Sequence, residues 1–190
     1  MYNPFPFDDP KPINRPKLSE KTINSIVAGG TPNVAKKFVA QIADRAKAEG
    51  VIVGIDGYTT ANWNLFVNLV ARECVINGLE LEVVDAAKAV LKSGKEIDDM
   101  IDPLLIWDTK IDPTLLYGKL YHGGYIGLFD QAKMEQFRND VPAMKAPGKL
   151  VVVAGYGCMI TELRDLYDIK CWFDITPMKT MLRIRGGEYS

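Results

Sequence analysis

Two nearly continuous apolar runs constrain the fold of this chain more than any other feature. They are Val51–Ile55 and Leu150–Ala154, and neither alternates apolar with polar residues. A strand of this composition is buried on both faces, which is typical of a parallel sheet covered by helices. Two further strands are predicted at Leu81–Val84 and Cys171–Ile175. We therefore predict a parallel sheet with Val51–Ile55 at its centre, flanked by Leu150–Ala154 and Cys171–Ile175, with each of these strands buried on both faces.

Helical patterns separate the predicted strands. They cover Asn62–Ile76, Ala132–Asn139, Thr161–Leu166 and Pro177–Arg185. An earlier helix is predicted to start at Thr31-Pro32, because Thr is a good N-cap and Pro suits the first helical position, and to stop at Gly50. Strands that alternate with helices indicate βαβ units. The predicted fold class is therefore α/β, with a three-layer parallel sheet.

Composition and charge narrow the class of protein. The chain has 190 residues and a formal net charge of -1 with dispersed Lys and Arg, which argues against nucleic-acid or anionic-membrane binding. No apolar run approaches the roughly 20 residues that span a bilayer, and the N-terminus lacks a signal-peptide pattern, so a cytoplasmic location is predicted. Cys74, Cys158 and Cys171 share no metal-ligand spacing and are predicted to be small buried hydrophobes. With His122 as the single histidine, we predict no metal site.

The first 17 residues differ from the rest of the chain. Met1–Lys17 contains five prolines, which forbid a regular helix and predict an extended arm. Its aromatic residues, Tyr2, Phe5 and Phe7, suggest that the arm packs on its own domain or on a partner. A short helix is predicted next, at Ser19–Val27. The domain organisation predicted is thus an arm, 1–17, followed by one α/β domain, 18–190.

The turn after the first strand aligns with a phosphate-binding loop of the G-x-x-x-x-G-K-[ST] type. The aligned residues are Gly57, Tyr58, Thr59, Thr60, Ala61, Asn62, Trp63 and Asn64. Trp63 takes the place of the Lys, whose charge an indole cannot supply to a phosphate. Asn64 takes the place of the magnesium-holding Ser or Thr. Two readings remain open: the loop binds nucleotide or phosphate through its backbone N–H groups, or it only connects strand to helix and Trp63 is packed.

The order of segments from Val51 to Glu188 resembles the uridine kinase and phosphoribulokinase group of P-loop kinases. The resemblance rests on the loop and on the segments Leu81–Asp85, Val151–Gly157, Leu163–Ile175 and Met181–Arg185. It implies a P-loop kinase-like fold, in which Asp85 acts as the base toward the acceptor hydroxyl. It also implies that Arg183 and Arg185 close over phosphates as a lid. Alternatively, Asp85 caps the helix that follows it and the two arginines are solvated.

The segment from Tyr117 to Tyr125 is the candidate acceptor-side pocket, because it is predicted to lie over the strand ends. Its candidate substrate-binding residues are Lys119, Tyr121 and His122. The alternative is a packed surface turn without a binding role.

The departures from the kinase pattern decide the predicted function. Besides the changes in the loop, Ala154 replaces an acidic residue that the resemblance implies on the third strand. Phosphoryl transfer depends almost wholly on positioned charge and metal. We therefore favour a pseudokinase domain, which keeps the fold for interaction or regulation, over a uridine kinase-like enzyme that phosphorylates a nucleoside or sugar with ATP. Whether magnesium and ATP bind as cofactors stays open.

The end of the sequence suggests a larger protein. The chain stops at Ser190, directly after the lid segment, whereas the kinase group continues with a helix and a fifth strand. We predict a domain truncated at its C-terminus, and the resemblance extends to degenerate modules that precede cupin domains of mannose-6-phosphate isomerase-like proteins, which implies a role in carbohydrate metabolism. The partners expected are a C-terminal domain of the same polypeptide or a second copy of the chain. Trp63, without a phosphate to bind, is expected to be largely buried.

Overall fold

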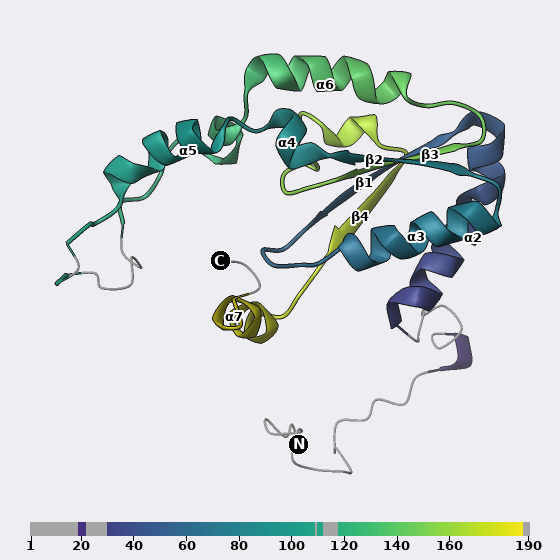
Figure 1. Ribbon diagram of the computed structural model, residues 1–190, viewed down its shortest axis with the longest axis horizontal. Coiled ribbons are helices and arrows are strands. Elements are labelled where there is room, and N and C mark those ends of the chain that lie inside the picture. The colour runs from purple at the N-terminus through teal and green to yellow at the C-terminus, as the bar shows by residue number, and fades with distance from the viewer. Residues whose placement is uncertain (1–18, 22–29, 109, 112–117, 188–190) are drawn as a thin grey trace, which may run out of the picture.

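The computed structural model describes residues 19–21, 30–108, 110–111 and 118–187. The predicted N-terminal arm, 1–17, lies outside these residues, as does most of the predicted helix Ser19–Val27. Within the described part, the chain folds into an α/β arrangement of three layers (Figure 1).

A four-stranded parallel sheet forms the middle layer. Its strands are β1 (Val51–Gly57), β2 (Glu80–Asp85), β3 (Lys149–Ala154) and β4 (Ile169–Phe173), in the order β2-β3-β1-β4. All three pairings are parallel, which confirms the predicted sheet and the central place of β1. The fourth strand begins and ends two residues earlier than predicted. The prediction that this strand is buried on both faces was wrong, because β4 lies at the edge of the sheet and alternates half-buried with exposed residues.

Helices cover both faces of the sheet. In Figure 1, α2 (Gly30–Glu49) and α3 (Asn64–Ile76) lie below it, and α4 (Ala86–Val90) and α6 (Gln131–Ala143) lie above it. The remaining helical elements are α5 (Gly94–Ile101), α7 (Pro177–Arg185) and three 3-10 helices: η1 (Asp102–Leu104), η2 (Tyr125–Leu128) and η3 (Arg164–Leu166). The prediction of a helix over Thr161–Leu166 was wrong for most of that range. Most hydrogen bonds there join residues three apart, as in the pair from Leu166 N to Leu163 O, so the segment forms turns and the short helix η3.

Each face of the sheet has its own hydrophobic core. Alternate residues of β1 point to opposite faces, so Val53 packs toward α2 and α3, whereas Ile52 packs toward α4 and α6. Gly54 lies in the middle of β1, where a Cβ atom would stand 2.4 Å from the ring of Tyr167. The tyrosine, only 3% exposed, fills the space that a side chain at position 54 would take.

A half-buried carboxylate fixes the start of β4 against its neighbours. Asp168 accepts hydrogen bonds from the backbone N–H of Ile52, at 2.9 Å, and from Lys145, at 3.0 Å. Arg45 of α2 donates to the same carboxylate at 2.6 Å. Burial alone would raise the pKa of Asp168, but the hydrogen bond from Ile52, Lys145 and Arg45 together hold this pKa below its usual value. The contact therefore ties a sheet strand, a helix and the turn after α6 to one ionised group.

The cysteines are free thiols. Cys74 and Cys158 are buried, as predicted, while Cys171 is only half-buried. Burial raises the pKa of Cys158 to about 12 and that of Cys74 to about 11, so both thiols stay protonated at neutral pH.

In the described residues, no helix has the length and apolar character needed to cross a membrane.

Candidate functional site

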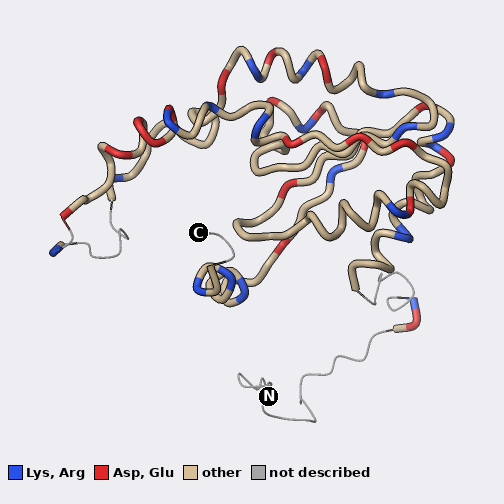
Figure 2. The backbone as a smooth tube through the Cα atoms, viewed as in Figure 1, with Lys and Arg blue, Asp and Glu red and all other residues tan. Residues whose placement is uncertain are grey.

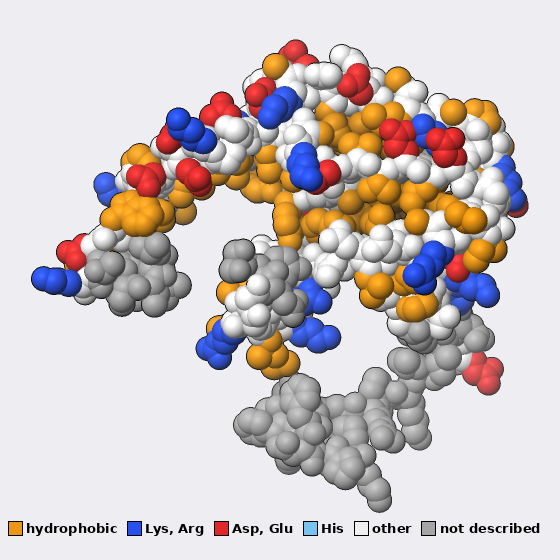
Figure 3. Space-filling model, in the orientation of Figure 1, with side chains coloured by type: hydrophobic (Ala, Val, Ile, Leu, Met, Phe, Trp, Pro, Cys, Tyr) orange, Lys and Arg blue, Asp and Glu red, His pale blue; other side chains and the backbone are white. Residues whose placement is uncertain are grey.

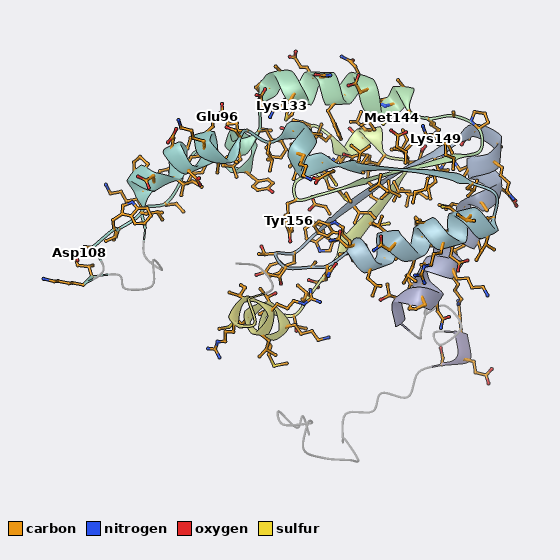
Figure 4. The ribbon with its side chains drawn as sticks, viewed as in Figure 1. Glu96, Asp108, Lys133, Met144, Lys149 and Tyr156 are labelled. Carbon is orange, nitrogen blue, oxygen red and sulfur yellow. The ribbon has the colours of Figure 1, made fainter. Side chains whose placement is uncertain are left out.

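The candidate site lies at the edge of the sheet where β1, β2 and β3 have their carboxyl ends. Open α/β sheets bind ligands at this edge, because the loops that follow neighbouring strands meet there. A cavity of about 710 Å³ opens between the loop after β1, the end of β2 and the loop after β3. Figure 4 shows Tyr156 at this edge, close to the start of α3. The cavity is lined by Ala61, Asn62, Trp63, Asn64, Val67, Val83, Val84, Asp85, Ala87, Ala154, Gly155 and Tyr156.

The lining combines aromatic, amide and acidic groups. Trp63 and Tyr156 meet edge to face, with ring centroids 4.9 Å apart. Asn62 and Asn64 add two side-chain amides, and Asp85 is the one charged residue of the lining. A cavity with a carboxylate and no cationic side chain in its lining suits a neutral or cationic polar molecule better than a phosphate.

The expectation that Trp63 is largely buried was met only in part, because its ring also borders the cavity. Its side chain is half-buried, packing partly against the core between the sheet and α2–α3 and partly bordering the cavity. The physical reason is its position just before α3, at the carboxyl edge of the sheet, where the ring of Tyr156 packs against the indole and the cavity begins.

Asp85 both borders the cavity and caps a helix. One carboxylate oxygen, Oδ1, accepts a hydrogen bond from the backbone N–H of Lys88 at 3.2 Å, which makes Asp85 the N-cap of α4. The other oxygen lies 3.5 Å from the ammonium group of Lys88. The two readings left open by the sequence are therefore compatible, and the role of Asp85 as a base stays a prediction.

Many backbone N–H groups of the loop after β1 donate hydrogen bonds to acceptors within the protein. Tyr58 N donates to Phe173 O at 2.9 Å, and Ala61 N donates to Tyr58 O at 2.8 Å. Asn64 N donates to the side chain of Asn62 at 3.0 Å, and Gly57 N donates to the Asp56 carboxylate at 2.8 Å. A phosphate-binding loop works by pointing such groups at the ligand. Here they point at protein acceptors.

Helix α7 and Tyr156 hold the middle of this loop. Thr60 has a φ of 70°, a left-handed conformation that is uncommon outside glycine and that suits the third position of a type II turn. Its backbone N–H donates to the hydroxyl of Tyr156 at 3.1 Å, and its side chain donates to Thr180 at 3.2 Å. Arg183 donates to the carbonyl oxygen of Thr60. The strained residue is thus held from both sides, by the loop after β3 and by α7.

Asp56, the second-last residue of β1, carries a buried carboxylate. Its side chain is 6% exposed. Besides Gly57, the backbone N–H groups of Gly157 and Met159 donate to its Oδ2 atom at 3.0 and 3.1 Å. The carboxylate therefore joins the end of β1 to the loop after β3 and occupies a group of N–H donors of the kind that binds anions.

The two arginines predicted to form a lid have different positions. Arg183 borders a smaller cavity of about 280 Å³, together with Asn62, Lys179 and Asp174. Arg185 is exposed near the end of α7. Figure 2 shows the Lys and Arg residues of α7 gathered around this helix. The cations of α7 thus lie beside the loop, but outside the lining of the larger cavity.

The predicted acceptor-side residues lie apart from this site. Lys119 and His122 are exposed and Tyr121 is half-buried. The backbone N–H of Lys119 donates to Leu104 O at 2.7 Å, which places this segment beside η1. None of the three residues lines the cavities at the carboxyl edge. Their role in substrate binding stays a prediction.

Sequence reasoning missed the residue that organises the site, Tyr156. It borders the larger cavity, packs against Trp63 and accepts the hydrogen bond from Thr60. Its position between Gly155 and Gly157, directly after a buried strand, was the available signal. A Cβ atom at Gly157, whose φ is 82°, would stand 2.6 Å from the ring of Tyr125. Glycine is therefore required there.

Within the described residues, no three His, Cys, Asp or Glu side chains gather as metal ligands.

The fold and the site define an α/β domain with a parallel sheet and a ligand-sized cavity at its carboxyl edge. The chain belongs to the family described as a domain of unknown function, DUF8485, whose model matches residues 35–190. A comparison with curated proteins found no match.

Two solved structures show distant similarity. One is described as a possible uridine kinase from Bacillus stearothermophilus; it is 10% identical, with a TM-score of 0.45, and the match covers 82% of this chain and 89% of that one. The other is Rif2 in complex with the C-terminal domain of Rap1; it is 10% identical, with a TM-score of 0.40, and the match covers 75% of this chain and 52% of that one.

Proposed function

We propose that this chain is a kinase-like domain that no longer transfers phosphate and that serves as an interaction or regulatory module. The observation that carries the proposal is the loop after β1, whose backbone donors have protein acceptors and whose Thr60 carbonyl accepts a hydrogen bond from Arg183. Trp63 and Asn64 stand where a kinase needs a Lys and a metal-holding hydroxyl. Each missing charge-assisted hydrogen bond forgoes about 1.5–3 kcal/mol of phosphate binding.

Titration with magnesium-ATP tests this proposal. Calorimetry at micromolar concentrations should show no binding heat, because a phosphate would have to displace acceptors that are covalently part of the chain. Tight, metal-dependent binding would contradict the proposal and reinstate an enzyme.

A variant can separate the effect of the side chains from that of the loop geometry. Trp63→Lys with Asn64→Thr restores the charge and the hydroxyl but leaves the contacts of Thr60 with Tyr156 and α7. We expect it to bind no better than the natural chain. Recovery of ATP binding in this variant would show that the two substitutions, and not the hydrogen-bonded loop, explain the lost affinity.

One observation favours the second candidate, a uridine kinase-like enzyme that phosphorylates a nucleoside or sugar. Asp85, at the end of β2, borders the cavity of about 710 Å³, as a base toward an acceptor hydroxyl must. The parallel sheet, with β1 between β3 and β4, is consistent with the same class of fold. The absence of cationic side chains from the cavity lining weighs against phosphate transfer there. The sequence-based association with a mannose-6-phosphate isomerase-like protein stays a prediction.

The surface of α7 supports the interaction role. The helix has no buried residue, and it exposes four apolar side chains: Met178, Met181, Leu182 and Ile184. Figure 3 shows apolar side chains of α7 on the side away from the sheet. Thr180 and Arg183, on the other side of the helix, contact the loop. Apolar surface of this kind on a helix without buried residues is typical of an interface.

We therefore expect the chain to associate with a second copy of itself through α7. Sedimentation should give a mass above that of the monomer, and replacing Met178, Met181 and Leu182 by serine should weaken the association at least about 10-fold, because each buried apolar side chain contributes about 1.5–3 kcal/mol. A matched control replaces Val75 and Ile76, which are 79% and 74% exposed at the end of α3, by serine. A monomeric natural chain, with or without residues 1–17, would contradict the expectation.

A further inference from the structure

Tyr156 also lines a second cavity, of about 320 Å³. Four aromatic residues from four different segments line it: Tyr58, Tyr125, Tyr156 and Trp172. Tyr58 follows β1, Tyr125 begins η2, Tyr156 follows β3 and Trp172 belongs to β4. The remaining lining residues are Asp56, Gly57, Thr59, Gly157 and Ile160.

The charge of this cavity comes from Asp56. Its carboxylate is held by three backbone N–H groups, and no Lys, Arg or His among the described residues forms an ion pair with it. Tyr125 lines the same cavity as Asp56, and burial, followed by the negative charge of Asp56, raises the pKa of its hydroxyl. The cavity therefore combines a fixed negative charge with tyrosine and tryptophan rings, whose faces are also electronegative.

We propose that this aromatic cavity binds an alkylated ammonium group. A quaternary or methylated ammonium carries a diffuse positive charge and sheds water easily, so it gains from several aromatic rings at once. Asp56, which lines the cavity, attracts the cation through its charge. No direct hydrogen bond is needed, and a quaternary ammonium has no N–H group to donate one. A phosphate or carboxylate would be repelled, and a neutral molecule would gain only apolar contact. This proposal does not depend on the function proposed above.

The rings that line the cavity are partly exposed, so a ligand can reach them. Trp172 is 61% exposed, Tyr125 is 48% and Tyr58 is 47%. The side chain of Trp172 lies on the same face of the sheet as Asp56, since the two residues are paired in register between β4 and β1. An indole exposed to this extent leaves apolar surface in contact with water, which is unfavourable. A bound ammonium group would cover that surface.

The test compares a cation with its neutral isostere. Choline and tetramethylammonium are titrated into the natural chain, with 3,3-dimethylbutanol as the uncharged analogue of choline, and the indole N–H signals are followed by NMR. The expected result is saturable binding of both ammonium probes that shifts the signal of Trp172 and leaves that of Trp107. The alcohol should bind at least about 10-fold more weakly.

Two variants assign the effect to the aromatic cavity. Trp172→Leu keeps an apolar side chain but removes the ring, and it should weaken choline binding about 10-fold in ligand-observed NMR. Trp107→Leu is the matched control, because Trp107 is 57% exposed and lies outside the cavity. It should leave choline binding unchanged.

A third probe, the amide of acetylated ε-trimethyl-lysine, distinguishes the two sources of an ammonium group. Tighter binding of choline indicates a free metabolite, and tighter binding of the trimethyl-lysine probe indicates a modified side chain. Failure of all three ammonium probes to saturate, or equal binding of the neutral alcohol, would overturn the proposal.

Discussion

Replacing Asp56 with alanine should destabilise the fold by about 4 kcal/mol. The change leaves the backbone N–H groups of Gly57, Gly157 and Met159 without their acceptor in a buried place. Each buried donor without a partner costs about 1–3 kcal/mol. Chemical denaturation, with far-UV circular dichroism as the signal, measures the change in the free energy of unfolding.

Two further variants make this prediction specific. Asp56→Asn keeps one acceptor oxygen but presents an NH2 group to a donor, so its loss of stability should be smaller than that of alanine but clearly measurable. Asp85→Ala removes an acidic residue that is exposed and caps one short helix, and should cost about 1 kcal/mol. A loss for Asp56→Ala no larger than that for Asp85→Ala would show that the three hydrogen bonds contribute little.

A second large effect is expected at Gly54. A Cβ atom there would meet Cδ2 of Tyr167 at 2.4 Å, and the tyrosine is packed between the sheet and its neighbours with 3% exposure. Overpacking of a rigid core costs about 1–3 kcal/mol, and the severity of this contact places Gly54→Ala at the upper end, about 3 kcal/mol. The midpoint of urea denaturation should fall accordingly.

A double-mutant cycle tests the cause of that loss. Tyr167→Ala alone should destabilise the chain by about 3–5 kcal/mol, as expected for removal of a buried aromatic side chain. Combined with Gly54→Ala, the total should be smaller than the sum by about 1–3 kcal/mol, because the added methyl group then enters vacant space. Gly94→Ala is the control: a Cβ atom there contacts nothing within 4 Å, so the first residue of α5 should tolerate it. Additive losses in the cycle would rule out the steric explanation.

The sheet could be predicted from the sequence because its signal is local. Val51–Ile55 and Leu150–Ala154 are apolar without alternation, and this alone requires cover on both faces and therefore a central place in a parallel sheet. The edge strand β4 was placed two residues too late, because the exposed Lys170 interrupts the apolar pattern at its start.

The candidate site was harder to predict because its contacts join distant parts of the chain. The loop at Gly57–Asn64 was located correctly by its position between strand and helix, but its state was not. The hydrogen bonds that occupy it come from Tyr156, Thr180 and Arg183, about 100 residues or more away in the sequence. No periodicity or motif reports such pairings. Asp56 illustrates the same limit, since its partners Gly157 and Met159 belong to another loop.

The contacts of α7 with the loop after β1 affect which part of the molecule opens first. None of the residues of α7 is buried, whereas the strand that precedes the loop is buried at every position. Native proteins open first where few apolar contacts are buried, so α7 belongs to the part of the molecule with the lowest local stability. The contacts of Thr60 with Thr180 and Arg183 are therefore expected to open together with α7, before the sheet unfolds, while the hydrogen bond from Thr60 to Tyr156 still holds the loop.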